Sequence, residues 1–362
     1  MIGSGAPGGG ETFVQSVSLM GTVVTMQVVV RESSARAGDC REAVARAFDW
    51  FREVEASCTR FDPAGEVASL AQRVGKPVPV SATLFHATEV ALAVAAASGG
   101  AFDPTVGVRM AERGFKNNHR TGEAVDLSIE AGDGVSFRDV VVDPQRRTIT
   151  LRRPLVLDLG AVAKGLAIDL AARELAPFSH FAIDAGGDLY LAGASEHNEP
   201  WRVGIRHPRQ TDQILATLRA SGVSVCTSGD YERPAPRGDG HHIVDPRTGR
   251  SSDAVASVTV VAPSAVLADA LGTAAFVLGV RDGLDLLAQH DVEGLIVTTS
   301  LEWHATQGMQ RDYELRPAAA GGAVRGPAVL RDPQGAADDP ADDTRRDRGT
   351  GRGRGAARSR PR

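Results

Sequence analysis

Short segments rich in β-branched residues, several joined by tight turns, constrain the fold of this 362-residue chain most strongly. Residues 13–30 alternate apolar and small polar side chains around Gly21, which predicts a strand pair or a bent strand. Asp143-Pro144 separates two further runs within residues 140–155, as in a hairpin. Because strands outnumber helices and partly form hairpins, the sequence predicts an α+β fold with mixed, largely antiparallel sheets rather than a doubly wound parallel sheet.

The remaining elements follow from apolar periodicity. Further strands are predicted at 155–159, 181–184, 189–192, 201–206, 215–220, 223–227, 255–262 and, as the last strand, 294–299. Helices are predicted at 39–57, 161–175, 264–277 and 282–288, and from an N-cap at Ser81 to a stop at Gly99-Gly100.

Composition divides the chain into three parts. Residues 1–12 form a Gly-rich leader, 13–316 one domain, and 317–362 a tail rich in Ala, Gly, Asp and Arg, which lacks apolar periodicity and is expected to be disordered. The spaced arginines of the tail resemble a weak RNA-binding arm, but a solvated extension is favoured. With a net charge of -5, the chain as a whole has no electrostatic attraction to nucleic acid.

The same composition bears on the compartment. No apolar run approaches the roughly 20 residues of a membrane helix, and neither a signal peptide nor a lipoprotein leader is evident. The three cysteines are irregularly spaced and form no metal knuckle, which suits a reducing compartment. The sequence as written therefore predicts a cytoplasmic protein that meets a membrane only through its partner.

One stretch combines a strand end, an acid, a glycine and a helix that begins with a lysine. It reads Leu-Asp-Leu-Gly-Ala-Val-Ala-Lys-Gly and includes Asp158 and Lys164. Free N–H groups at a helix start, together with a lysine, suit an anion such as a diphosphate. An ordinary strand–turn–helix with a solvated lysine is about equally compatible with this stretch alone.

A second stretch places a carboxylate and a hydroxyl on one helix face. Asp269 and Thr273 stand four residues apart in an apolar helix, where an unpaired carboxylate is costly. Mg²⁺ prefers such oxygen ligands and completes its shell with water and phosphate. The pair therefore indicates a metal site, although the pattern alone is weak.

Three glycine–acid turns and a histidine pair remain. The turns surround Asp103, Asp188 and Asp230, and each is compatible with a simple turn. His241 and His242 point to opposite sides of an extended segment, so at most one is expected to be functional.

The order of these motifs closely resembles that of the FAD:protein FMN transferases, the ApbE-like family. The resemblance covers roughly residues 13–315. It rests on Met20-Gly21-Thr22, Ala101-Phe102-Asp103-Pro104, the Asp158–Gly165 stretch, Ala185-Gly186-Gly187-Asp188, Thr227-Ser228-Gly229-Asp230, His242-Ile243-Val244-Asp245-Pro246-x-Thr248-Gly249 and Asp269-x-x-x-Thr273.

The resemblance implies an ApbE-like fold and assigns a site. FAD would be bound by Met20, Phe61, Ala101, Phe102, Asp103, Asp158, Lys164 and Ile243, and Mg²⁺ by Asp269, Thr273 and the backbone carbonyl of Ala161. Phe61 stands where the family often has tyrosine, so this chain keeps an aromatic face and loses a hydroxyl.

The resemblance also implies a reaction. A threonine or serine hydroxyl of an acceptor protein, such as a membrane redox subunit, attacks the FMN-side phosphorus of FAD, and AMP departs. Lys164 and Mg²⁺ would neutralise charge on the diphosphate, with His242 as first and Asp245 as second candidate for the base. Two alternatives are an FAD pyrophosphatase, in which water replaces the hydroxyl, and a non-catalytic FAD-binding protein.

Overall fold

The computed structural model describes residues 11–31, 35–118, 122–125, 128–130, 132, 134–236 and 240–318. They belong to one compact unit, Met1–Arg331, and the second unit, Asp332–Arg362, lies outside them. The predicted leader and tail are therefore largely outside the described residues. Strand β1 already begins at Glu11, and the last described strand, β14, includes Pro317, one residue past the expected domain end.

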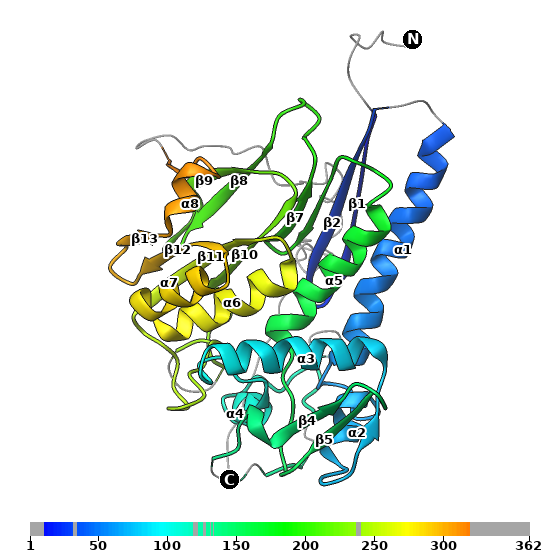
Figure 1. Ribbon diagram of the computed structural model, residues 1–362, viewed down its shortest axis with the longest axis vertical. Helices are drawn as coiled ribbons and strands as arrows, with labels where there is room; N and C mark the ends of the chain where they lie inside the picture. Colours follow the sequence, from blue (N-terminus) through cyan, green and yellow to red (C-terminus); the bar gives the residue numbers. More distant parts are fainter. Residues whose placement is uncertain are drawn as a thin grey trace, which may run out of the picture. The chain divides into compact units, whose positions relative to one another are not determined.

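An eight-stranded sheet forms the centre of this unit (Figure 1). Its order is β1-β2-β6-β7-β10-β11-β12-β13, and every neighbouring pair is antiparallel. The strands are β1 (Glu11–Leu19), β2 (Thr22–Val30), β6 (Phe181–Ala185), β7 (Asp188–Ala192), β10 (Val223–Gly229), β11 (Val255–Ala262), β12 (Glu293–Thr298) and β13 (Trp303–Ala305). The predicted α+β class with largely antiparallel sheets is confirmed.

Helices cover one face of this sheet, and a small second sheet covers the other. The helices on this face are α1 (Ala35–Cys58), α5 (Gly160–Leu175), α6 (Ala265–Leu278) and α7 (Val280–Gln289), and α3 (Ala82–Ala97) packs against α1, α5 and α6. The second sheet is β8 (Trp201–His207), β9 (Gln210–Ala220) and β14 (Arg316–Pro317), with α8 (Gln307–Arg311) nearby. Alternation along the strands supplies both cores: Val258 and Val260 of β11 face the helices, and Val261 faces the small sheet.

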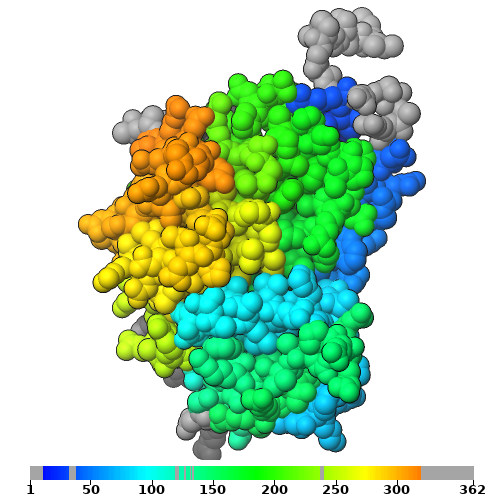
Figure 2. Space-filling model, viewed as in Figure 1, coloured from blue at the N-terminus to red at the C-terminus, as the bar shows by residue number. Residues whose placement is uncertain are grey.

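A third, three-stranded sheet lies on the other side of α3 from α5 and α6 (Figures 1 and 2). It consists of β3 (Val78–Pro79), β5 (Thr148–Leu151) and β4 (Val140–Asp143), with α2 (Glu66–Ala71), α4 (Gly107–Glu112), η1 (Pro104–Val106) and η2 (Phe137–Asp139) around it. The β4–β5 hairpin and the Ser81 N-cap, which accepts the Leu84 N–H at 3.1 Å, confirm the prediction.

Two element predictions are wrong. Residues 155–159 are buried except for the half-buried Asp158, but they form no strand, because their backbone bonds go to η1 and α4: the Asp158 N–H donates to the Pro104 carbonyl and the Val156 carbonyl accepts from Gly107. The strand near residue 294 is not the last, since β13 and β14 follow it. Helix α1 also begins at Ala35, four residues before its predicted start.

Candidate active site

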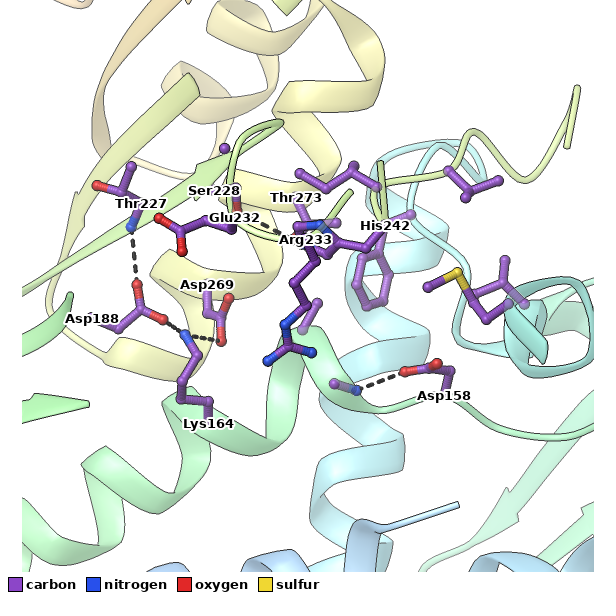
Figure 3. Close-up of a pocket in the computed structure, with 18 of the residues that line it drawn as sticks. Asp158, Lys164, Asp188, Thr227, Ser228, Glu232, Arg233, His242, Asp269 and Thr273 are labelled. Atoms are coloured by element: carbon purple, nitrogen blue, oxygen red, sulfur yellow. Dashed lines mark hydrogen bonds and ion pairs between the residues drawn. The ribbon is translucent and has the colours of Figure 1, made fainter. Parts of the chain in front are cut away.

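Distant segments converge on a cavity of about 350 Å³ at the N-terminal end of α5 and beside the middle of α6 (Figure 3). Most of the predicted site residues line it: Met20, Ala101, Phe102, Asp103, Asp158, Ala161, Lys164, His242, Ile243, Asp269 and Thr273. Phe61 and Asp245 are not among the lining residues.

Close packing of α5 against α6 brings the lysine helix and the aspartate helix together. A Cβ on Gly165 would lie 2.5 Å from the Ala265 carbonyl oxygen, so only glycine permits this approach. Asp169, one turn further along α5, accepts the Ala265 and Val266 N–H groups at 2.7 and 3.1 Å. A carboxylate at the N-terminus of α6 satisfies free N–H groups and fixes the two helices in register.

The Lys164 ammonium lies between two buried carboxylates (Figure 3). It contacts the Asp188 carboxylate and lies 3.5 Å from Asp269 Oδ2. The other Asp188 oxygen accepts the Thr227 N–H at 3.0 Å, which holds that carboxylate in place from β10. Lys164 therefore compensates two negative charges that would otherwise be costly to bury.

Asp158 is fixed by Arg60 on the other side of the cavity. Its Oδ2 accepts from Arg60 Nε at 2.8 Å and its Oδ1 from the Gly160 N–H at 3.0 Å. Burial would raise the pKa of Asp158, but the Arg60 charge and these hydrogen bonds outweigh it and hold that pKa below its ordinary value. The carboxylate therefore stays ionised at the start of α5.

Phe61 lies next to this pair rather than in the cavity wall. Its ring packs under the Arg60 guanidinium, 4.2 Å from ring centroid to Cζ. The flavin contact predicted for Phe61 therefore stays a prediction, and the contact that the structure describes is with the arginine that fixes Asp158.

Two of the other predicted FAD-site residues are held by their own turns. Met20 and Gly21, with φ of 51° and 73°, form the two-residue connection of the β1–β2 hairpin, which carries Met20 to the cavity. Asp103 is buried and accepts the Thr105 N–H, the Thr105 hydroxyl and the Phe137 N–H at 2.7–2.9 Å. Asp103 therefore fixes the backbone of η1 and η2 at the cavity edge.

The two adjacent histidines are separated as predicted. His241 is buried, with its Nε2 2.8 Å from the Ser252 carbonyl and its ring 5.4 Å from that of Phe276. His242 lines the cavity, and its Nδ1 is buried without a hydrogen-bond partner among the described residues. Burial, with a contribution from the Arg233 charge, lowers the pKa of His242 to about 4. The ring is therefore neutral at pH 7 and able to accept a proton.

Asp245, the second candidate for the base, is engaged elsewhere. Its two carboxylate oxygens each accept a 2.9 Å hydrogen bond from the Arg247 guanidinium. Burial alone would raise the pKa of Asp245. The hydrogen bonds and the charge of Arg247 have a larger, opposite effect, so the pKa lies below its ordinary value. Both Asp245 oxygens are thus occupied by Arg247, and the side chain does not line the cavity.

The predicted magnesium ligands share one part of the cavity. Asp269 Oδ2 is buried and accepts no hydrogen bond from the described residues, and the Thr273 hydroxyl lies one turn away, 3.4 Å from that of Ser228. Ala161 lines the same cavity. The described residues contain no cluster of three or more His, Cys, Asp or Glu side chains suited to a metal. Hard oxygen donors around one carboxylate fit Mg²⁺, which keeps much of its shell for water and phosphate.

Asp188, Ser228 and Arg233 are among the cavity residues that were not predicted as site residues. Asp188 and Ser228 stand in glycine-containing turns that the sequence singled out, and such turns at strand ends were the available signal. Arg233 carries no local signal, because its position depends on the fold of the segment after β10.

The residues that line this cavity fall within a segment that matches a known protein family. The model of the ApbE family matches residues 20–296, which contain every predicted site residue. The chain belongs to the ApbE family.

Curated relatives of this ApbE chain agree in name. An FAD:protein FMN transferase of Treponema pallidum is 33% identical over 329 residues, covering 83% of this chain and 90% of the relative. An FAD:protein FMN transferase of Rhodobacter capsulatus is 33% identical over 306 residues, covering 81% of this chain. The match spans only 56% of the length of that second relative.

Solved ApbE structures share the fold. The ApbE protein of Thermotoga maritima superposes with a TM-score of 0.71 at 25% identity, covering 83% of this chain and 99% of that one. The flavin transferase ApbE of Vibrio cholerae gives a TM-score of 0.70 at 23% identity, with the same coverage. No helix among the described residues is long and apolar enough to cross a membrane.

Proposed function

We propose that this protein transfers the FMN half of FAD to a threonine or serine hydroxyl of an acceptor protein and releases AMP. The observation that carries the proposal is the convergence of Lys164, the Asp269–Thr273 pair and His242 on one cavity. The names of the Treponema and Rhodobacter relatives support the same reaction.

We assign FAD to this cavity. Met20, Ala101, Phe102, Asp103, Asp158, Lys164 and Ile243 would contact it, and all of them are lining residues. The diphosphate would lie beside the start of α5, near Lys164 and the assigned magnesium ligands.

We assign Mg²⁺ to Asp269, Thr273 and the Ala161 carbonyl, supported by the buried Asp269 Oδ2, which accepts no hydrogen bond from the described residues and has only the Lys164 ammonium 3.5 Å away. When bound, the ion would neutralise charge on the diphosphate and so favour departure of AMP. Without it, Lys164 alone faces the Asp188 and Asp269 carboxylates, and its charge is largely compensated by them.

We assign proton transfer to His242. As the acceptor hydroxyl oxygen forms its bond to the FMN-side phosphorus, its proton would pass to the neutral imidazole. The bond from that phosphorus to the bridging oxygen breaks, and AMP leaves with the electron pair. The lowered pKa keeps the imidazole neutral near pH 7, so its unprotonated nitrogen can take the proton, while the transfer to phosphorus carries the reaction forward.

Intact-mass spectrometry tests the reaction directly. The purified protein is mixed with FAD, Mg²⁺ and an acceptor, which is a threonine-containing domain taken from a flavinylated redox subunit. We expect the acceptor to gain the mass of an FMN group, and EDTA or Asp269→Ala to prevent the gain. Free FMN and AMP without acceptor labelling would identify a pyrophosphatase, and intact bound FAD a flavin-binding protein.

The acceptor and the compartment remain predictions from the sequence. We expect an acceptor such as a membrane redox subunit and a cytoplasmic location for this chain. Labelling of one purified candidate subunit over others, at equal concentration, would identify the acceptor.

A further inference from the structure

We propose that Arg233 binds the diphosphate of FAD and is the main protein cation for that group. The inference deepens the proposed function, since it takes FAD as the substrate of the cavity. It assigns the recognition of the diphosphate to a residue outside the motifs on which the family resemblance rests.

Arg233 reaches the cavity from a segment that is fixed on both sides. Before it, Asp230 receives two 2.7 Å hydrogen bonds from the Arg209 guanidinium, and its N–H donates to Ala256. After it, Pro234 pairs with His241, and the Arg233 carbonyl accepts the His242 N–H at 3.1 Å. The backbone of Arg233 is thus held beside His242, while its side chain is exposed.

The side chain points into the middle of the cavity. In Figure 3 the guanidinium lies between Lys164 and Asp269 on one side and Asp158 on the other. It makes no hydrogen bond or ion pair with any described residue. It is therefore a charged group with free donors, located where the two predicted halves of the FAD site meet.

The charges of the cavity lining leave little other positive charge for an anion. The lining contains five carboxylates (Asp103, Asp158, Asp188, Glu232 and Asp269) and two cationic side chains, Lys164 and Arg233. Lys164 is held by two of those carboxylates, and the cations from outside the lining, Arg60 and Arg206, pair with Asp158 and Glu232. A diphosphate entering this negative environment meets one uncompensated cation among the described lining residues, Arg233.

The charge of Arg233 already acts on the groups around it. It contributes to lowering the pKa of both His242 and Asp158. A guanidinium also offers parallel N–H donors that match two phosphate oxygens, which an ammonium cannot do. The geometry therefore favours direct binding of phosphate oxygens by Arg233.

Equilibrium binding of FAD, followed by calorimetry in the presence of Mg²⁺, tests the inference. We compare the wild type with Arg233→Gln, Arg233→Lys and, as a matched control, Arg202→Gln. Arg202 is an exposed arginine of β8 that does not line the cavity, and its substitution removes the same charge.

We expect Arg233→Gln to raise the Kd for FAD by at least about tenfold and to flatten its dependence on salt. Arg233→Lys should recover part of the loss, and Arg202→Gln should stay within about twofold of the wild type. Because the side chain is exposed, all three melting temperatures should match that of the wild type.

An Arg233→Gln protein that binds FAD as tightly as the wild type would overturn the inference. So would a loss accompanied by a lower melting temperature that Arg233→Lys does not restore. This test can fail independently of the proposed function. The wild type can label an acceptor even if Arg233 does not bind the diphosphate, and it can bind FAD through Arg233 even if it labels no acceptor.

Discussion

The environment of His242 keeps this imidazole neutral in a cavity rich in carboxylates. Burial and the nearby Arg233 charge oppose protonation more strongly than Asp158 favours it, so the pKa falls to about 4. The neighbouring His241 is oriented by the Ser252 carbonyl instead and takes no place in the cavity. Two identical side chains thus receive different roles from their surroundings.

The lowered pKa of His242 predicts an acid-sensitive fold. In the unfolded chain the imidazole titrates near 6.5, so below that pH the unfolded state binds the proton first. Above pH 6.5 the imidazole is neutral in both states and leaves the free energy of unfolding unchanged. As the pH falls from 6.5 toward 4, the unfolded state takes up the proton and the free energy of unfolding decreases. Between pH 7 and 5 we expect the free energy of unfolding to fall by about 2 kcal/mol from this residue.

Urea unfolding at the two pH values, with the wild type and His242→Gln, measures this difference. The variant should lose less stability than the wild type by about that amount. Equal losses would show that His242 titrates normally in the folded protein.

At pH 7 the His242→Gln variant should still bind FAD but transfer FMN at least about 100-fold more slowly, as expected for a lost general base.

The buried Asp269 oxygen, which accepts no hydrogen bond from the described residues, predicts that magnesium stabilises the fold. A ligand that binds only the folded state adds about 2.7 kcal/mol at 100 times its Kd. We expect Mg²⁺ to raise the melting temperature of the wild type but not that of Asp269→Asn, in a scan without FAD. Matching shifts in the two proteins would remove Asp269 from the metal site.

At the scale of elements, the crossing of α5 and α6 builds the charged part of the cavity. Gly165→Ala would place a methyl group against the Ala265 carbonyl, and either the helices separate or the contact is strained. We expect a loss of about 1–3 kcal/mol in the free energy of unfolding and weaker FAD binding, as Lys164 moves away from Asp269.

Gly38→Ala is the matched control for this substitution. Gly38 lies in α1 and is exposed, and a Cβ added to it would have no other group within 4 Å. Alanine there should stabilise the helix by up to about 1 kcal/mol and leave FAD binding unchanged. Urea midpoints and FAD titrations of both variants decide the comparison, and a harmless Gly165→Ala would refute the packing argument.

Local sequence was sufficient for most elements and for the motifs at their ends. The β1–β2 hairpin, the Ser81 cap and the α5 and α6 helices follow from patterns of turn, cap and periodicity. Residues 155–159 show the limit: their apolar run is typical of a strand, yet their partners are η1 and α4 rather than a neighbouring strand. Arg233 shows the same limit. Its position in the cavity depends on the pairing of its segment with residues 241–242 and on the hydrogen bonds from Arg209 to Asp230.

At the scale of the whole molecule, all elements of the cavity lie within the described part of Met1–Arg331. We therefore expect deletion of residues 331–362 to leave the melting temperature and the rate of acceptor labelling unchanged. The assay is the same mass measurement on the full chain and the truncated one. A large drop in labelling with intact FAD binding would instead give the tail a role in acceptor capture.

The pairing of β2 with β6 has a consequence for how the protein is made. Residues 31–180 lie between these neighbouring strands, so β2 keeps an open edge until that whole stretch has left the ribosome. Such long-range closure slows folding and exposes a hydrophobic strand to misassociation in the meantime. The cavity to which Met20 belongs also needs residues as far as Thr273, so ligand binding requires that the chain has been made and folded at least to that point.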